Sequence, residues 1–84
     1  MAPTQDRIRD RIEVHRQDGV ADVRLDRADK MNALDADMFS ALVETADLLS
    51  NDPGLRAVVL SGEGRSFCAG LDFASFAAMA GDSD

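Results

Sequence analysis

The stretch that decides the fold reads Ser61-Gly62-Glu63-Gly64-Arg65-Ser66-Phe67-Cys68-Ala69-Gly70-Leu71-Asp72. It follows the continuous apolar run 57–60, which is typical of a strand covered on both faces, as in a parallel sheet. The segment Gly62-Glu63-Gly64 interrupts that strand, and Gly70 indicates a sharp turn in front of a helix. The sequence therefore predicts a buried strand, a glycine-rich loop and a tight turn at a helix start.

The turn that ends this stretch is a candidate binding site for an oxyanion. Backbone N–H groups at a helix start have no intrahelical acceptor and lie at the positive end of the helix dipole. Small residues at Ala69 and Gly70 would let a ligand approach the main chain. The Leu71 N–H would then meet negative charge developing on a carbonyl oxygen. A plain strand-to-helix turn with an aspartate cap is the alternative.

Upstream of this stretch the pattern predicts a β-hairpin and an amphipathic helix. Apolar and polar residues alternate over 11–17 and again over 20–26, with the Asp18-Gly19 turn between the two runs. After an irregular loop, Asp35 has the character of an N-cap for a helix that ends near residue 49. The predicted buried stripe of that helix consists of Met38, Leu42, Thr45 or Ala46, and Leu49.

The remaining segments complete a β-β-α-β-β-α order, which is an α/β arrangement. Residues 1–10 are predicted to be a flexible start, 65–69 a short strand-like link and 72–81 a second helix. A strand that is apolar on both faces needs a layer on each side, and the two predicted helices do not supply both. We therefore expect 11–84 to be the amino-terminal part of a larger domain. Without the rest of that domain, one apolar face of the sheet would be exposed.

The composition is that expected of a cytoplasmic protein. The chain has 84 residues, a net charge of −7 and a single cysteine, Cys68, so no internal disulfide is expected. No apolar run approaches the roughly 20 residues of a membrane helix, and the charged residues 1–11 do not resemble a secretory signal. Because the chain is acidic, neither nucleic acid nor an anionic membrane is an expected partner. One group of basic residues is interpreted as solvated charge: Arg24, Arg27, Lys30 and Arg65.

Other catalytic patterns do not fit the sequence. The spacing of Gly62 and Gly64 breaks a dinucleotide fingerprint, and no lysine follows it as a phosphate-binding loop requires. One histidine and one cysteine are too few for a structural zinc site. Because His15 lies on the polar face of an early predicted strand, it is interpreted as a surface residue and not as the base of a Cys68 nucleophile.

Two segments, in order and at a matching separation, carry a family resemblance. Residues 67–72 read F-C-A-G-L-D, and residues 25–34 read L-D-R-A-D-K-M-N-A-L. They resemble the F-[CS]-A-G-x-D and L-x-R-P-x-x-x-N-A-L segments of the crotonase (enoyl-CoA hydratase/isomerase) superfamily, with Ala28 in place of the usual proline. The resemblance extends from about Glu13 to Met79. It implies a crotonase-type spiral core built from β-β-α units, of which this chain holds only the first part.

The resemblance also implies roles for individual residues. Two backbone N–H groups would stabilise an enolate oxyanion on an acyl-CoA thioester, and Leu71 would supply the first. The second donor and the acid and base carboxylates would come from residues outside these 84. The loop at Asp29 and Lys30 would line the CoA nucleotide and pantetheine, and the turn from Ala69 to Phe73 would contact adenine and the thioester. Asp72 would hold the turn and the helix start.

The reaction that this resemblance implies is that of enoyl-CoA hydratase, a lyase of fatty acid metabolism that adds water across the 2,3 double bond. Enoyl-CoA isomerase or another reaction of the superfamily is one alternative. A truncated, non-catalytic module that binds acyl-CoA or another protein is the second. No metal and no cofactor other than the coenzyme A of the substrate is implied. The resemblance further implies a homotrimer or a hexamer.

Overall fold

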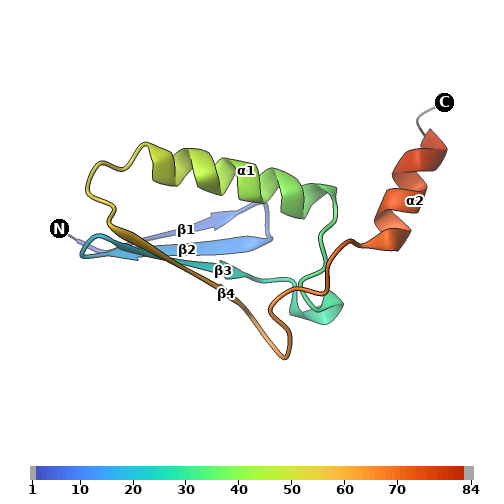
Figure 1. The fold of residues 1–84 in the computed structure, drawn as a ribbon, viewed down its shortest axis with the longest axis horizontal. Coiled ribbons are helices and arrows are strands. Elements are labelled where there is room, and N and C mark those ends of the chain that lie inside the picture. Colours follow the sequence, from blue (N-terminus) through green and yellow to red (C-terminus); the bar gives the residue numbers. More distant parts are fainter. Residues whose placement is uncertain (1, 83–84) are drawn as a thin grey trace.

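The computed structural model describes residues 2–82, which form one mixed sheet, a helix on its face and a helix beyond its end (Figure 1). The sheet has the strand order β1-β2-β3-β4. Its strands are β1 (Thr4–Ile8), β2 (Ile12–Gln17), β3 (Val20–Leu25) and β4 (Ala57–Gly62). The first three strands are antiparallel, and β4 runs parallel to β3. This arrangement confirms the predicted α/β class.

Helix α1 (Ala36–Ser50) connects the two parallel strands and covers one face of the sheet (Figure 1). Its N-cap is Asp35, whose Oδ1 accepts a hydrogen bond from the Met38 N–H at 2.8 Å, as the sequence predicts. Its C-cap is Asn51, two residues before a proline that cannot continue the helix. A short 3-10 helix, η1 (Ala28–Lys30), precedes α1, and α2 (Phe73–Asp82) follows the glycine-rich loop.

The core lies between α1 and one face of the sheet. Alternate residues of β2 and β3 point toward α1, because successive side chains of a strand face opposite sides. The buried apolar side chains are Ile12, Val14, Ala21, Val23, Leu25, Met38 and Ala41. Met38 and Thr45 are buried as predicted, whereas Ala46 is exposed and Ala41 takes a central place instead.

The amino-terminal segment corrects the prediction of a flexible start over 1–10. Residues 4–8 form β1, which pairs with β2 in the register Thr4–Arg16 to Ile8–Ile12. The two strands are joined through Arg9 and Asp10, whose φ angles are 52° and 55°. A tight hairpin of this kind normally carries Asn-Gly or Asp-Gly, which have little strain at positive φ. Arg9-Asp10 is therefore not a recognisable turn signal. Strand β1 also has the polar composition of a surface segment, because it is an edge strand.

The loop after β4 corrects a second prediction. Residues 65–69 form no strand, and the segment is instead held by side-chain and backbone contacts to residues 31–34. Only an isolated parallel bridge between Leu34 and Leu71 is present. The observed order of regular elements is therefore β-β-β-α-β-α with η1 before the first helix.

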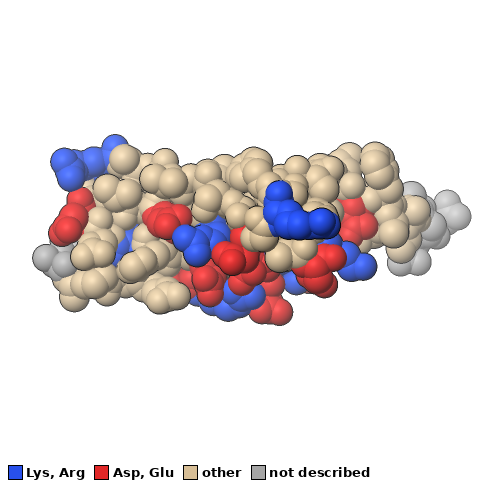
Figure 2. Space-filling view, turned by 90° about the horizontal axis from the view of Figure 1, so that it is seen from below, with Lys and Arg blue, Asp and Glu red and all other residues tan. Residues whose placement is uncertain are grey.

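The sheet face opposite α1 is polar over its first three strands. Basic and acidic side chains alternate there and form ion pairs, for example Arg7 of β1 with Glu13 of β2 across strands and Arg24 with Asp22 within β3. Figure 2, which views the molecule from this side, shows the two charges intermingled. This face needs no second layer, which explains why the antiparallel strands alternate so regularly in sequence.

Strand β4 differs, because it is apolar on both faces and lies at the sheet edge. Val58 and Leu60 point to the side of α1, and Val59 points to the opposite side, as the pairing with β3 dictates. The three side chains remain 51%, 52% and 51% exposed in the order 58, 59, 60. The expectation of an exposed apolar surface around this strand is confirmed.

Candidate functional site

The site is built where the two motif segments come together beyond the end of β3 and β4. The Ala69 N–H donates to the Met31 carbonyl at 2.9 Å, and the Leu34 N–H donates to the Gly70 carbonyl at 2.8 Å. The Asp72 N–H then donates to the Leu34 carbonyl at 2.9 Å. Residues 69–72 therefore run beside residues 31–34, although about forty positions separate them in the sequence.

The Leu71 N–H points away from this contact. In a parallel bridge the flanking residues of one segment bond to the central residue of the other, so the central residue's own N–H is directed to the opposite side. Here Gly70 and Asp72 make the bonds to Leu34, and within residues 2–82 the Leu71 N–H donates to no protein acceptor. It is a free backbone donor at the start of α2.

Gly70 keeps the approach to this donor open. Its φ of 92° is a conformation that side chains rarely adopt. A Cβ atom placed on Gly70 would have no heavy atom of the described residues within 4 Å. A ligand can therefore come close to the main chain at this turn.

Asp72 holds the start of α2. Its Oδ1 accepts from the Ser75 N–H at 3.2 Å, and its carbonyl accepts from the Phe76 N–H at 3.1 Å. Its Oδ2 accepts from Arg27 Nη1 at 2.9 Å. The Arg27 guanidinium, together with the Ser75 N–H, lowers the pKa of the Asp72 carboxyl below its ordinary value. The interpretation of Asp72 as a structural residue of the turn agrees with these contacts.

Asn32 is the buried centre of the loop, with no exposed side-chain surface. Its Nδ2 donates to the carbonyls of Glu63, Ser66 and Phe67 at 2.9, 2.9 and 3.2 Å, and its Oδ1 accepts from the Arg27 N–H at 2.7 Å. A backbone φ of 57° places the amide in this position, which asparagine tolerates better than most residues. Sequence reasoning assigned no role to Asn32, although an asparagine within an irregular loop was a signal for such a conformation.

Gly62 permits the close approach between the end of β4 and the loop. A Cβ atom at this position would lie 2.4 Å from the Phe67 carbonyl oxygen and 2.8 Å from Asn32 Nδ2. No side chain fits there without a shift of the backbone. The glycine of the β4 end and Asn32 therefore act together to fold the loop back on itself.

Arg27 and Asp35 belong to a largely buried ionic cluster beside the turn. Arg11 donates through Nε and Nη2 to the two carboxylate oxygens of Asp35 at 3.2 and 2.8 Å, and Arg27 Nη2 lies 3.5 Å from the same carboxylate. The hydrogen bonds from Arg11, with that from the Met38 N–H, lower the pKa of Asp35 to about 2. The interpretation of Arg27 as a solvated charge is wrong, because its side chain is only 13% exposed.

The other predicted substrate residues lie on the surface at the same end of the molecule. Asp29 and Lys30 are exposed on η1, which directly precedes the segment that contacts the turn. Ala69 is exposed, and Phe73 is 78% exposed on the first turn of α2. The Phe76 ring packs edge-on against Phe39 of α1, with ring centroids 5.9 Å apart. The structure thus brings all these residues to one end of the sheet.

Cys68 and His15 form no catalytic pair. Cys68 is half-buried beside the core, and its Sγ accepts from the Gly70 N–H at 3.4 Å. His15 is exposed on the sheet face opposite α1. The two side chains are therefore separated by the sheet, as the reading of His15 as a surface residue requires.

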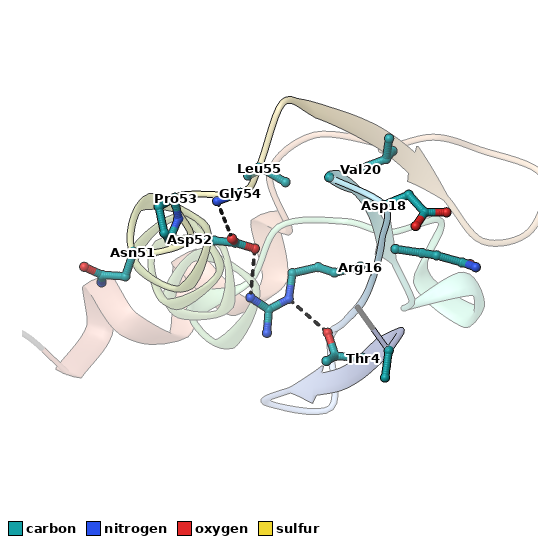
Figure 3. A pocket seen from close by; sticks show the side chains of 12 residues that line it. Thr4, Arg16, Asp18, Val20, Asn51, Asp52, Pro53, Gly54 and Leu55 are labelled. Atoms are coloured by element: carbon teal, nitrogen blue, oxygen red, sulfur yellow. Dashed lines mark hydrogen bonds and ion pairs between the residues drawn. The ribbon is translucent and has the colours of Figure 1, made fainter.

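A cavity of about 450 Å³ lies at the other end of the sheet (Figure 3). It opens between the β2–β3 turn and the loop that follows α1, and Leu55 and Val20 supply part of its apolar wall. Its central polar group, Arg16, pairs with Asp52 at 3.3 Å and with the Thr4 hydroxyl at 3.1 Å. None of the predicted site residues lines this cavity.

The fold and the turn define the class of protein: an α/β chain in which a parallel strand leads through a glycine-rich loop to a helix start with a free backbone donor. A sequence model of the enoyl-CoA hydratase/isomerase family matches residues 15–83. The chain therefore belongs to this family. No helix within residues 2–82 has the length and apolar character needed to cross a membrane.

Individual relatives show how far the likeness extends. The chain is 41% identical over 61 residues to a 4-chlorobenzoyl coenzyme A dehalogenase of Arthrobacter, covering 73% of this chain and 22% of that protein. It is 40% identical over 50 residues to an enoyl-CoA hydratase of Mycobacterium tuberculosis, covering 60% and 19%. An enoyl-CoA hydratase/isomerase structure from Mycobacterium paratuberculosis superposes with a TM-score of 0.79 at 32% identity, covering 88% and 30%. The chain thus spans roughly 19–30% of the length of these relatives.

Proposed function

We propose that the native protein acts on acyl-CoA thioesters and hydrates the 2,3 double bond of an enoyl-CoA. The observation that carries this proposal is the Leu71 N–H, which points away from its own backbone bridge at the start of α2. Next to it, Gly70 leaves room for a ligand. A backbone donor in this position stabilises negative charge on a thioester carbonyl oxygen as that charge develops.

The chemistry divides between these residues and others. Leu71 supplies one N–H to the enolate oxyanion, and a second N–H together with the carboxylates that move the proton comes from residues outside these 84. Asp72 is unsuited to be the base, because its carboxylate is engaged by Arg27 and the Ser75 N–H. The proposed reaction needs no metal and no cofactor other than the CoA portion of the substrate.

The CoA portion of the substrate is proposed to lie along the same end of the molecule. Lys30 is exposed there and offers a positive charge to a phosphate, with Asp29 beside it. The turn from Ala69 to Phe73 is proposed to contact adenine and the thioester. From its composition the native protein is further proposed to be cytoplasmic, and by family resemblance it is proposed to form a homotrimer or a hexamer.

The reaction is tested by incubating the native protein at full length with a short-chain enoyl-CoA and determining the mass of the product. Hydration predicts a product heavier by one water molecule. A product of unchanged mass with a shifted double bond would assign the isomerase reaction instead, which shares the oxyanion site. Binding of the thioester without any product would identify a binding module and contradict the proposal.

A further inference from the structure

The Arg27 side chain has contacts that a simple surface charge would not make. It leaves the chain two residues after β3 and reaches under the turn with 13% of its surface exposed. One nitrogen, Nη1, donates to the Ala33 carbonyl at 3.1 Å and to Asp72 Oδ2 at 2.9 Å. The other, Nη2, lies 3.5 Å from Asp35 Oδ2.

These contacts enclose the bridge that orients the Leu71 N–H. Ala33 immediately precedes Leu34, and Asp72 immediately follows Leu71. Arg27 Nη1 therefore links Ala33, which precedes the bridge residue Leu34, to Asp72, which follows the bridge residue Leu71. The bridge itself has only two hydrogen bonds, from Leu34 N–H to Gly70 and from Asp72 N–H to Leu34.

The same contact fixes the start of α2. Asp72 uses one carboxylate oxygen for Arg27 and the other for the Ser75 N–H. A shift of the guanidinium would therefore move the helix start and the turn together. Because the free donor belongs to the residue directly before Asp72, its direction depends on this ion pair.

Support of the α1 cap does not account for the arrangement of Arg27. Asp35 already has a two-pronged partner in Arg11, so the helix cap does not depend on Arg27. Lysine at position 27 would supply the same charge, but it could not reproduce the planar fork of arginine that reaches a carbonyl and two carboxylates at once. The position requires the geometry of a guanidinium as well as its charge.

We infer that Arg27 is a positioning residue, which holds the Leu71 N–H at the angle and depth needed to meet the substrate's oxyanion. This inference rests on the proposed function, because it concerns the same donor. Arg27 does not touch the substrate and acts only through Ala33 and Asp72. A displacement of about 1 Å at a reacting centre can lower turnover by about 10²-fold. A substitution of Arg27 that moves the Leu71 N–H by such an amount should therefore have a measurable effect on kcat.

The test measures how strongly the donor polarises a bound thioester. Butyryl-CoA labelled with ¹³C at the thioester carbonyl is bound to the native full-length protein, and the carbonyl stretch is recorded by difference infrared spectroscopy. In the unmodified protein the stretch should fall below that of free butyryl-CoA. Arg27→Gln should return most of the shift toward the free value, and kcat should fall by at least about 10-fold while KM changes far less.

A matched control separates position from charge. Arg24→Gln removes the same charge from the preceding strand, where the side chain is 45% exposed and pairs with Asp22 and Glu63 at 3.5 Å. It should leave the carbonyl stretch and kcat unchanged. Arg27→Lys should behave like Arg27→Gln in the infrared measurement, because lysine lacks the fork.

Each remaining outcome decides the matter. An Arg27→Gln protein that binds butyryl-CoA with the full wild-type carbonyl shift overturns the inference and leaves the proposed function intact. An unmodified protein that binds butyryl-CoA with no carbonyl shift overturns the proposed function itself. If Arg27→Gln does not fold, Asp72→Asn serves instead, since asparagine retains the cap to Ser75 and loses the charged partner. A full shift in Asp72→Asn would likewise overturn the inference.

Discussion

Asp35 performs two tasks at the start of α1. Its carboxylate caps the helix through the Met38 N–H and also accepts two hydrogen bonds from Arg11. The cap requires an oxygen acceptor, which asparagine also supplies, whereas the ion pair requires the negative charge. The two contributions can therefore be separated by pH.

Asp35→Asn should make the free energy of unfolding less dependent on pH in the acid range. The pKa of Asp35 is lowered from 3.8 to about 2 in the folded state, so its ion pair stabilises above pH 3.8 and is lost as pH falls toward 2. At pH 6 the variant should be about 1–2 kcal/mol less stable than the unmodified protein, and the difference should shrink to a small fraction of that value as the pH falls to about 2. Urea unfolding at several pH values measures this difference.

Asp37→Asn is the control for that experiment. Asp37 lies on the same helical turn, but its side chain is 59% exposed and its ion pairs with arginine are long, at 3.7 and 3.8 Å. It should show little effect at any pH. A stability difference for Asp35→Asn that stays constant down to pH 2 would show that the charge of Asp35 contributes nothing.

The structural roles of the loop residues could be predicted only in part from the sequence. The N-cap role of Asp35 and the structural role of Asp72 follow from local patterns that a helix start imposes. The roles of Asn32 and Arg27 depend on carbonyl and carboxylate groups that lie up to 45 positions away. Local patterns carry no information about such distant partners. For this reason Arg27 was wrongly interpreted as a solvated charge, and Asn32 was assigned no role.

At the scale of elements, β4 has a surface that favours pairing with another chain. It is the edge of the sheet, and its Val58, Val59 and Leu60 side chains are half-exposed. A long apolar edge strand with free backbone groups is a template for strand addition. The 84-residue polypeptide should therefore self-associate, and sedimentation velocity measures its association state.

Val59→Lys should reduce that association, because a charge on the edge strand opposes strand pairing. Ala46→Lys places the same charge on an exposed position of α1, away from the edge, and should leave association unchanged. An unmodified polypeptide that sediments as a monomer with a cooperative thermal transition would contradict the prediction. Equal effects of the two lysine variants would assign the association to net charge.

The elements themselves were predicted where periodicity was strong. The β2–β3 hairpin, α1 and β4 follow from alternation, an amphipathic stripe and an apolar run, respectively. Strand β1 was missed because its residues are polar and its turn uses Arg9 and Asp10 at positive φ. The strand expected over 65–69 was wrong, because Asn32 satisfies the loop carbonyls that a strand partner would otherwise bind.

At the scale of the whole molecule, the fold brings residues 31–34 beside residues 69–72. Strand β3 and η1 deliver the first segment, and β4 with its glycine-rich loop delivers the second (Figure 1). The parallel register of β3 and β4 places both segments at the same end of the sheet. The position of the Leu71 N–H is therefore a property of the assembled fold, which the turn sequence alone did not determine.

The most direct test of this account replaces the Leu71 backbone amide by an ester in the native full-length protein. The ester exchanges the N–H for an oxygen and retains the leucine side chain, while Leu71→Ala retains the N–H and removes most of the side chain. Loss of one oxyanion donor typically lowers kcat by about 10²–10³-fold, so the ester should show a loss of that size with nearly unchanged ground-state binding. Leu71→Ala should retain most of the turnover. A folded ester protein with wild-type kcat would contradict the assignment of Leu71 as the donor.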